Sequence, residues 1–432
     1  MLEGEIRALG DIAGRSVARP SVVARDVHGA VTQRVFGALG PLGAPTRIVH
    51  DTVSRASYRG VRVALRAPLD AGGRALARLA PPSSRRLADS ELGALALGAA
   101  NGVFGDRLAR DHPDLSLELA IRRHGRDVRL DADGVAEAFA DATPRLAVFV
   151  HGLCGTEHTW GFRPPGADPR PTYGALLHEE LSYTPVYVRY NTGRRISENG
   201  RALAAALEDL TAGWPTEVEQ VAVIGHSMGG LVARSASHYG QAEGHRWTER
   251  VRHVVCLGTP HLGAPLEKVA NVAGWAFNRL PETRPFGDLF VNDRSVGIKD
   301  LRFGNWVEED WCDCDPDEFL RDRCREVPFL PSATYCFVGA TLSRRPEGVG
   351  GRVGDLLVTY PSASGSGRRR RIPFDVENGA HVGGIDHMSL LNHPAVYGQI
   401  RRWLAGAHPP GGEVRRDGDD AAGELAARDR PV

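Results

Sequence analysis

Short, almost continuously apolar runs recur along the central part of the chain and alternate with stretches of helical periodicity. The apolar runs are Leu146–Val150, Pro185–Tyr190, Val221–Ile224, Val251–Leu257 and Thr334–Val338. Helical stretches separate several of them, notably Ile196–Leu210 and Met228–His238. Strands that are apolar on both faces and alternate with helices are typical of a parallel sheet covered by helices on both sides. We therefore predict an α/β fold with a doubly wound, mainly parallel sheet.

The domain defined by this pattern spans residues 113–406. It is expected to open with a hairpin whose strands, Leu115–Ile121 and Asp127–Leu130, flank His124-Gly125, and to close with a helix ending at Arg402-Trp403-Leu404. Residues 407–432 are polar and rich in Gly, Pro and charged residues. Such a segment buries too little apolar surface to fold, so we predict a disordered tail.

Residues 1–112 have a different, helical pattern. One apolar series recurs every four residues and ends at Gly40-Pro41, and a second precedes Pro68: Val23, Val27, Val31, Val35 and Leu39, then Val49, Val53, Ala56, Gly60 and Val63. Arginines occupy the outer positions, and residues 1–110 contain 16 Arg against 9 Asp and Glu. The region is either a basic amphipathic surface that contacts anionic lipid or a helical appendage packed on the core with solvated arginines. We favour the appendage.

More than seventy residues separate the run ending at Leu257 from the run beginning at Thr334. This is far longer than an ordinary connection between elements. The segment is rich in aromatic residues, with Trp275, Phe277, Phe286, Phe290, Trp306 and Trp311. An aromatic insertion of this kind is typical of a lid over a functional site, and we place it at about residues 266–330.

The hexapeptide Gly225-His226-Ser227-Met228-Gly229-Gly230 directly follows an apolar run and precedes a helical stretch. It is a G-x-S-x-G pattern in the strand-turn-helix context that a nucleophile elbow needs. The sharp turn forces the serine backbone into a strained conformation, and Gly225 and Gly229 prevent steric collision around it. We predict that Ser227 is a catalytic nucleophile; the alternative is a glycine-rich turn with an inactive serine.

A serine hydroxyl needs a base to accept its proton and an acid to orient that base. On a sheet of this kind the order along the chain is serine, acid, histidine. Asp355, in the loop region after the Thr334–Val338 run, and His387, before the C-terminal helix, satisfy that order. Other candidates lie near the histidine: His381 and His393 as bases, and Asp386 as the acid, although a direct neighbour has difficulty reaching the far ring nitrogen.

The oxyanion that develops during acyl transfer needs oriented N–H donors. One is expected to be the amide of Met228, directly after the nucleophile. The other is expected in the loop after the first apolar run, which reads His151-Gly152-Leu153-Cys154-Gly155-Thr156. Leu153 is our choice and Cys154 the alternative. The alternative is that His151 and Gly152 form only a simple turn at the end of the strand.

Composition excludes several other classes of function. The net charge of zero removes any global argument for nucleic-acid binding. Cys312, Cys314 and Cys324 match no zinc template and lack a fourth ligand, so we expect no metal and free thiols. The first residues have no signal-peptide pattern, and no stretch approaches the length that spans a bilayer. We expect a cytoplasmic protein, with peripheral membrane contact through the basic N-terminal region as the open alternative.

Three segments together resemble the bacterial true lipases and the GPI-inositol-deacylase-like hydrolases of the α/β-hydrolase superfamily. They are the loop beginning His151-Gly152, the elbow around Ser227, and Gly258-Thr259-Pro260-His261-Leu262-Gly263-Ala264-Pro265. The resemblance covers residues 145–265 and, less closely, 334–404. It implies that Thr259 and His261 are site-wall residues. The Asp355 segment is similar to the acid loop of these families, but Leu356 stands where they usually have glycine.

This resemblance implies hydrolysis of a carboxylic ester through an acyl-enzyme, without a cofactor, on a small-molecule or lipid ester. Three alternatives remain open: an acyltransferase, a thioesterase or amidase with the same triad, and a non-catalytic binding module with a hydrolase fold. A run of four arginines, Arg368–Arg371, either meets an anionic headgroup or is a solvated loop, which we favour.

Overall fold

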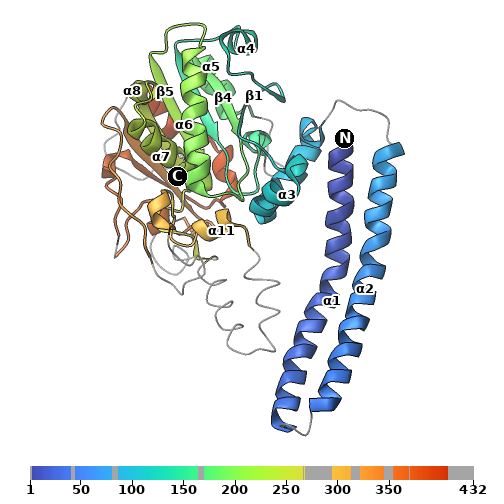
Figure 1. Cartoon of the computed structure of the whole chain (residues 1–432). Helices are drawn as coiled ribbons and strands as arrows, with labels where there is room; N and C mark the ends of the chain where they lie inside the picture. Colours follow the sequence, from blue (N-terminus) through green and yellow to red (C-terminus); the bar gives the residue numbers. More distant parts are fainter. Residues whose placement is uncertain are drawn as a thin grey trace, which may run out of the picture.

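One continuous sheet organises the central part of the molecule (Figure 1). The structure, a computed structural model, describes residues 2–39, 44–79, 86–163, 170–265, 267, 294–312, 322–344, 354–368 and 370–406. Within these residues eight strands follow the order β2-β1-β4-β3-β5-β6-β7-β8. Strands β3 to β8 pair in parallel, and β1 is antiparallel to both β2 and β4. The predicted doubly wound, mainly parallel sheet is confirmed.

Five of the six parallel strands coincide with the apolar runs. Their bounds are Arg145–Val150 for β3, Tyr183–Arg189 for β4, Gln220–His226 for β5, Val251–Leu257 for β6 and Thr334–Thr341 for β7. The sixth, β8 (Gly379–Gly383), was not predicted. Its sequence, Gly-Ala-His-Val-Gly, contains no apolar run: at the edge of the sheet it pairs, among the described strands, with β7 alone, and of its five residues only Ala380 and Val382 join the hydrophobic core.

The opening hairpin forms around His124-Gly125, as predicted, but both of its strands are shorter than expected. Strand β1 is Ala120–Arg123 and β2 is Arg126–Asp127. The predicted strand from Leu115 was wrong in its first half, because Leu115 closes the short helix η3 (Pro113–Leu115) and packs against α3. Likewise, Leu130 lies next to Asp131, whose side chain caps helix α4 (Ala132–Ala138).

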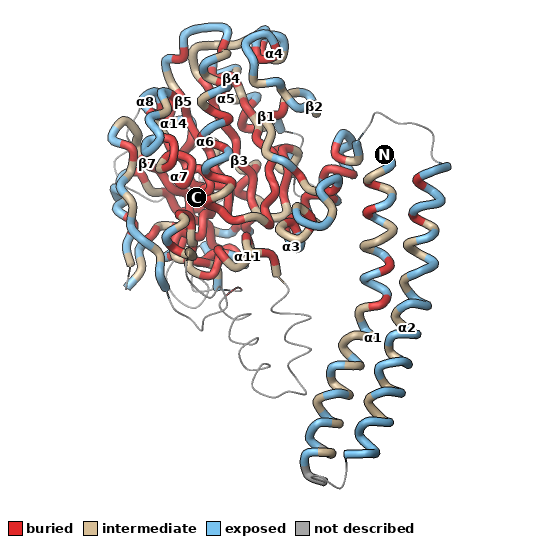
Figure 2. The backbone as a smooth tube through the Cα atoms, viewed as in Figure 1, coloured by how far each residue is buried: buried red, intermediate tan, exposed pale blue. Residues whose placement is uncertain are grey.

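Alternate residues of the central strands pack into two separate hydrophobic cores. Leu146, Val148 and Val150 of β3 face one core, whereas Ala147 and Phe149 face the other. The first core is covered by α4, α6 (Ile196–Ala212) and α7 (Met228–Ala242), and the second by α5 (Tyr173–Leu181) and α14 (Pro394–Leu404). This period of two, apolar on both sides, is why the strands read as continuous apolar runs. Figure 2 shows the resulting buried centre.

Short elements connect these layers at the two edges of the sheet. They are η4 (Glu157–Gly161), α8 (Trp247–Arg250), α11 (Val296–Asp300), η6 (Glu308–Asp310), α13 (Tyr360–Ala363), η7 (Val376–Asn378) and η8 (Met388–Leu391). Helices η4, α11 and η8 lie at the edge where the parallel strands have their carboxyl ends. On open α/β sheets this edge is where ligands bind.

The N-terminal region forms two long antiparallel helices, α1 (Glu3–Leu39) and α2 (Ala44–Leu79), followed by η2 (Leu87–Asp89) and α3 (Glu91–Asp111). Helix α2 contains the second apolar series and continues through Pro68. The α1–α2 hairpin extends away from the sheet, whereas α3 packs against the short helices η4 and α11 (Figure 1). None of the helices in the described part of the chain is long and apolar enough to cross a bilayer.

Candidate active site

Ser227 sits at a sharp turn between β5 and α7, in a backbone conformation that L-residues rarely adopt. Its φ is 54° and its ψ is −124°. The turn is possible because neighbouring positions lack a Cβ: one at Gly225 would lie 2.5 Å from Gly230 Cα, and one at Gly229 would lie 2.2 Å from the carbonyl oxygen of Val150. The amide of Ser227 donates to the carbonyl of Leu257 (2.8 Å), which ties the turn to the neighbouring strand. Strain of this kind is typical of functional sites.

His387 and Asp355 lie in hydrogen-bond contact although thirty-two residues separate them. Nδ1 of His387 is 2.7 Å from Oδ2 of Asp355, and both side chains are buried. The other carboxylate oxygen, Oδ1, accepts from the amides of Leu357 (3.1 Å) and Val358 (2.8 Å). The amide of His387 also donates to the carbonyl of Asp355 (3.1 Å), so backbone and side chain together fix the pair.

This contact determines the tautomer of His387. A carboxylate only accepts, so Nδ1 carries the proton and Nε2 carries the lone pair. Nε2 is buried and has no hydrogen-bond partner among the described residues, and His387 lines the same cavity as Ser227. The ring is therefore arranged to accept a proton on the side that faces the cavity.

His226 links the elbow to the loop that carries His387. Its Nε2 donates to the carbonyl oxygen of His387 (3.1 Å), and the two ring centroids are 4.7 Å apart. Burial holds the pKa of His226 well below its ordinary value, and the neighbouring His387 lowers it further. His226 is therefore a neutral positioning group. The sequence marked it only as the variable position of the elbow.

The amide of Leu153 is the better placed of the two oxyanion donors considered in the loop after β3. The Cys154 amide donates to Oγ1 of Thr192 (3.1 Å) and is therefore engaged. The Leu153 and Met228 amides donate to no group within the described ranges. Leu153 lines the cavity beside Ser227, and Met228 begins α7 directly after it. Two amides at such positions suit a developing oxyanion.

Gly152 lies in the loop of residues 151–156 after β3, which we call the oxyanion loop because it contains the candidate donor Leu153. It brings this loop into contact with the elbow. A Cβ at this position would lie 2.9 Å from Ser227 Cβ and 3.1 Å from His226 Nδ1. We therefore expect Gly152→Ala to displace the loop and to lower kcat for ester hydrolysis by about a hundredfold, since a shift near 1 Å has an effect of that size. Gly398→Ala, where a Cβ would meet nothing within 4 Å, is the matched control. Equal kcat values for the two variants would contradict this packing role.

His151 fixes the start of the same loop. Its Nε2 accepts from the amide of Tyr190 (3.3 Å), its Nδ1 contacts the carbonyl of Gly152 (2.9 Å), and the Tyr190 ring stacks on it at 4.3 Å. Burial lowers the pKa of His151 from 6.5 to about 4, although the Gly152 carbonyl acts in the opposite direction. The imidazole is therefore neutral in the folded protein.

This depressed pKa predicts a loss of stability in acid. The unfolded chain binds the His151 proton more tightly than the folded one, so the contribution is present above the unfolded pKa of 6.5 and disappears as the pH falls toward 4. At pH 5 the loss from His151 is about 2 kcal/mol of unfolding free energy. Denaturant unfolding at about pH 7.5 and 5 should show a pH dependence smaller by this amount in His151→Asn. An identical pH dependence in the variant would refute the assignment.

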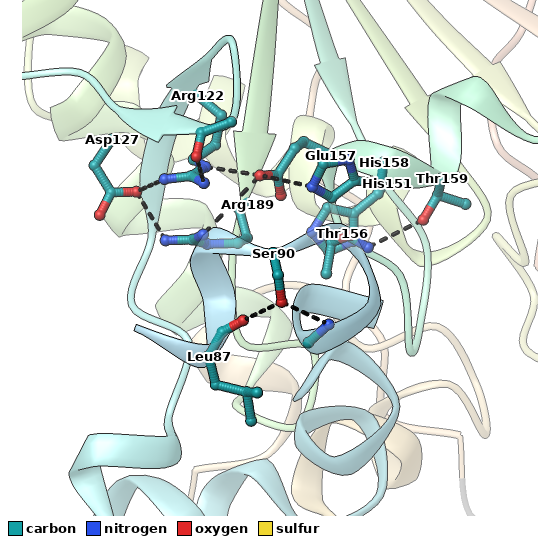
Figure 3. A network of polar contacts seen from close by, with 12 residues as sticks. Leu87, Ser90, Arg122, Asp127, His151, Thr156, Glu157, His158, Thr159 and Arg189 are labelled. Atoms are coloured by element: carbon teal, nitrogen blue, oxygen red, sulfur yellow. Dashed lines mark hydrogen bonds and ion pairs between the residues drawn. The ribbon is translucent and has the colours of Figure 1, made fainter. Parts of the chain in front are cut away.

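A charged network behind the loop joins it to the sheet (Figure 3). Glu157, the first residue of η4, accepts from Nε of the buried Arg122 at 2.7 Å. Asp127 pairs with both Arg122 and Arg189. Burial alone would raise the pKa of Glu157, but Arg122 and Arg189 more than offset this, so its pKa lies below the ordinary value. The network anchors the segment that follows the Leu153 amide to β1, β2 and β4.

Ser227 and His387 open into one cavity of about 810 Å³. Its walls are mainly apolar and come from the loops after β3, β6 and β7 and from residues in or next to η4, α11 and η8: Leu153, Phe162, Pro260, Ala264, Ile298, Leu301, Leu357, Val358 and Met388. Glu267 and Arg294 add a buried ion pair at 2.7 Å. A large apolar cavity with few polar groups suits a hydrophobic ligand.

Helix α3 contributes to this site, although the sequence predicted no site residue within 1–112. Glu91 and Leu95 line the cavity. Gly102 allows the close approach, since a Cβ there would lie 2.3 Å from Cys154 Sγ in the oxyanion loop. Glycines at four- and three-residue spacing, at 98, 102 and 105, were the signal that could have revealed this packing.

The competing residues have other contacts. His381 lies on β8 and bonds Thr341 Oγ1 (2.8 Å), His393 accepts from the Ala395 amide (3.2 Å) at the start of α14, and Asp386 accepts from the Ser389 amide (2.8 Å). None of the three lines the cavity.

The two residues assigned to the site wall lie next to the elbow in different ways. Thr259 is buried against Gly230, whereas Nδ1 of His261 contacts the buried guanidinium of Arg234 (3.1 Å). Arg370, from the arginine run, donates to the carbonyl of His261 (2.8 Å), so at this position the solvated-loop interpretation was wrong: the guanidinium braces the loop after β6.

Part of the predicted lid falls within the described residues. Ile298 and Leu301, in or next to α11, line the cavity, whereas Trp306 and Trp311 pack on the core, each against an arginine at 4.3 and 4.5 Å. Residues 266, 268–293 and 313–321, with Trp275, Phe277, Phe286 and Phe290, and the tail 407–432 lie outside the described residues. Within those described, no His, Cys, Asp and Glu side chains group as metal ligands; Cys314 lies outside them.

Residues 144–274 match the family model of the PGAP1-like alpha/beta domain. This range contains the oxyanion loop, the elbow and the Gly258–Pro265 segment, and it confirms the resemblance drawn from them. Together with the strand order, the match identifies the fold as that of the α/β-hydrolases. No curated protein matches the chain in sequence.

Several solved structures are similar to this chain. The Bacillus licheniformis lipase BlEst2 in mature form is 21% identical, covers 60% of this chain and 91% of its own, and has a TM-score of 0.38. A Pyrobaculum calidifontis esterase is 13% identical, with 75% and 94% covered and a TM-score of 0.38. The phospholipase PlaB from Legionella pneumophila is 15% identical, with 61% and 58% covered and a TM-score of 0.35.

Proposed function

We propose that this protein is a serine ester hydrolase that acts on hydrophobic esters through an acyl-enzyme. The observation that carries the proposal is the shared cavity: Ser227, on a strained turn, and His387, held at Nδ1 by Asp355, open into one space. Nucleophile, base and orienting acid in this arrangement are the requirements for activating a hydroxyl at neutral pH.

In the first half-reaction Oγ of Ser227 attacks the ester carbonyl carbon while Nε2 of His387 takes the hydroxyl proton. The negative charge that develops on the carbonyl oxygen is stabilised by the amides of Leu153 and Met228. The imidazolium that forms is stabilised by Asp355, and it gives its proton to the leaving alcohol as the C–O bond breaks. The acyl group then remains on Ser227.

In the second half-reaction His387 removes a proton from water, which attacks the acyl carbon. The second tetrahedral intermediate expels Ser227, and the proton returns to its Oγ. All steps are proton transfer and nucleophilic substitution, for which the side chains and amides of this chain are sufficient. The apolar walls around Phe162, Leu301 and Met388 provide the room for a hydrophobic acyl group.

A substrate panel tests the proposed class. We expect turnover of p-nitrophenyl esters, with kcat/KM rising as the acyl chain lengthens because a longer chain buries more of itself against the cavity walls. Matched thioesters and anilides, and added alcohol with product analysis, distinguish the thioesterase, amidase and acyltransferase alternatives. A folded protein that cleaves no ester in the panel would contradict the proposal.

A further inference from the structure

The α1–α2 hairpin contacts the rest of the molecule through its base. The Glu5 side chain accepts from the Leu87 amide (2.8 Å), His112 approaches Asp11 (3.1 Å), and Ala8 joins a small apolar cluster with α3. From this base the hairpin extends away from the sheet (Figure 1). The expected helical appendage therefore packs on the core only in part: α3 does so, whereas the hairpin reaches α3 and η3 through its base alone.

One face of α2 is apolar and exposed along much of its length. Val49, Val53, Ala56, Gly60, Val63 and Ala67 follow each other at intervals of three and four residues and are all exposed. The three valines are 64%, 60% and 54% exposed. The face toward α1 is different, since it carries half-buried polar residues such as Ser54 and Tyr58, and the Tyr58 ring lies 5.8 Å from His28 of α1. This apolar stripe is therefore the outer face of the hairpin, and Figure 2 shows that α2 is exposed along most of its length.

A row of arginines runs beside the apolar stripe. Arg55, Arg59 and Arg62 have the same three- and four-residue spacing and lie roughly 100° around the helix from the stripe, whereas Arg66, the next in the row, pairs with Asp11 of α1 and with Asp70. Between residues 20 and 66 the chain has seven arginines against Asp26 and Asp51. The outer part of the hairpin is thus strongly basic as well as apolar on one side.

We propose that this stripe and its arginine row bind an anionic lipid surface, with the hairpin lying in the plane of the interface. Aliphatic side chains flanked by arginines match the boundary between acyl chains and acidic headgroups. A second copy of the chain is a poorer occupant, because it would place the same excess of arginines against itself without acidic partners.

Helix α3 connects the hairpin to the wall of the cavity. It follows the hairpin directly and contributes Leu95 to the cavity wall, while Leu92 is 81% exposed nearby on the same helix. Leu357, 44% exposed, also lines the cavity. If the proposed ester hydrolysis is correct, on which this step alone rests, the membrane supplies the ester.

Vesicle pelleting with the full chain tests the binding without any use of activity. Vesicles of phosphatidylcholine with phosphatidylglycerol should pellet the protein at least about tenfold better than phosphatidylcholine alone, and added salt should weaken the binding. The combined variant Val49→Gln, Val53→Gln, Val63→Gln should lose at least about tenfold in partitioning, since glutamine keeps helix propensity and charge but removes the apolar face. Val376→Gln, at an 86% exposed valine outside the hairpin, is the matched control.

Two double variants test whether the positive charge of the arginines contributes to binding. Arg55→Gln with Arg59→Gln should weaken binding to the anionic vesicles by about tenfold, whereas the same positions changed to lysine should retain it. Ser227→Ala should bind as the wild type does, so a failure of the esterase proposal would leave this result unaffected.

Two outcomes would overturn the proposal: binding to neither kind of vesicle, or equal binding by the triple glutamine variant. Self-association by light scattering that is lost in the triple variant, without vesicle binding, would assign the stripe to a second copy.

Discussion

Ser227→Ala is expected to lower kcat for p-nitrophenyl ester hydrolysis by about 10⁶-fold, the effect of removing the nucleophile from a serine triad. The alanine variant leaves the Leu153 and Met228 amides and the cavity in place, so a residual rate above that of water is expected from oxyanion stabilisation and binding. Because the methyl group is smaller than the hydroxymethyl group and Ser227 is only partly buried, the fold should be unaffected.

Initial rates over a substrate range measure this effect, and thermal unfolding checks the fold. Ser364→Ala is the matched control, since this serine lies on a short turn with Ser366 and does not line the cavity. If Ser227→Ala kept more than about a hundredth of the wild-type kcat, another group would be the nucleophile and the mechanism would be wrong.

Asp355→Asn is expected to lower kcat by about 10⁴-fold with little change in KM. Oδ2 of Asp355 accepts the Nδ1 proton of His387, and the carboxylate stabilises the imidazolium formed during the reaction. An amide NH₂ at that point would favour the other tautomer, with the proton on Nε2, and a protonated Nε2 cannot accept the hydroxyl proton of Ser227.

Asp386→Asn is the matched control because Asp386 is the direct neighbour of His387, is exposed and only caps a turn. Its kcat should remain within about twofold of wild type, as expected for a surface substitution. If the two asparagine variants were reversed in their effects, the acid would be Asp386, and the side-chain contact between Asp355 and His387 would be structural only.

Local pattern was sufficient for the elbow, because the backbone requirement of one turn lies within six residues. Gly225 and Gly229 stand where a Cβ would collide, and this requirement is visible in the sequence. Leu356, which stands where the related families usually have glycine, has an unusual backbone conformation. Its φ is +87°, in the region that favours glycine, so the residue that differs from the related families adopts the backbone conformation that their glycine makes easy.

Contacts between residues far apart in the sequence could be predicted only from the order of the candidate residues along the chain. The order Ser227, Asp355, His387 suggested one site, but the hydrogen bond between Asp355 and His387 depends on β7 and β8, and β8 itself carries no apolar run. The spacing of the glycines at 98, 102 and 105 indicates a close packing face on α3, but not that this face meets the loop that contains Cys154.

The N-terminal hairpin shows a different limit of the sequence. Its apolar series predicted helices, and helices formed, but the pattern does not say what the apolar face meets. Val49 and Val53 recur at the helical spacing that would also suit a buried face, yet they are 64% and 60% exposed. Periodicity establishes that a face exists, whereas its partner is a property of the assembled molecule and its surroundings.

The most direct test of the central claim is the position of the covalent adduct left by a fluorophosphonate. Among the described residues, Ser227, Thr159 and Cys154 line the cavity with a hydroxyl or a thiol, and burial raises the pKa of the Cys154 thiol and so lowers its reactivity. Peptide mass spectrometry of the labelled protein should place a single adduct on the peptide that contains Ser227, and Ser227→Ala should carry none. An adduct on Cys154, or no adduct on the folded wild type, would contradict the assignment of Ser227 as the nucleophile.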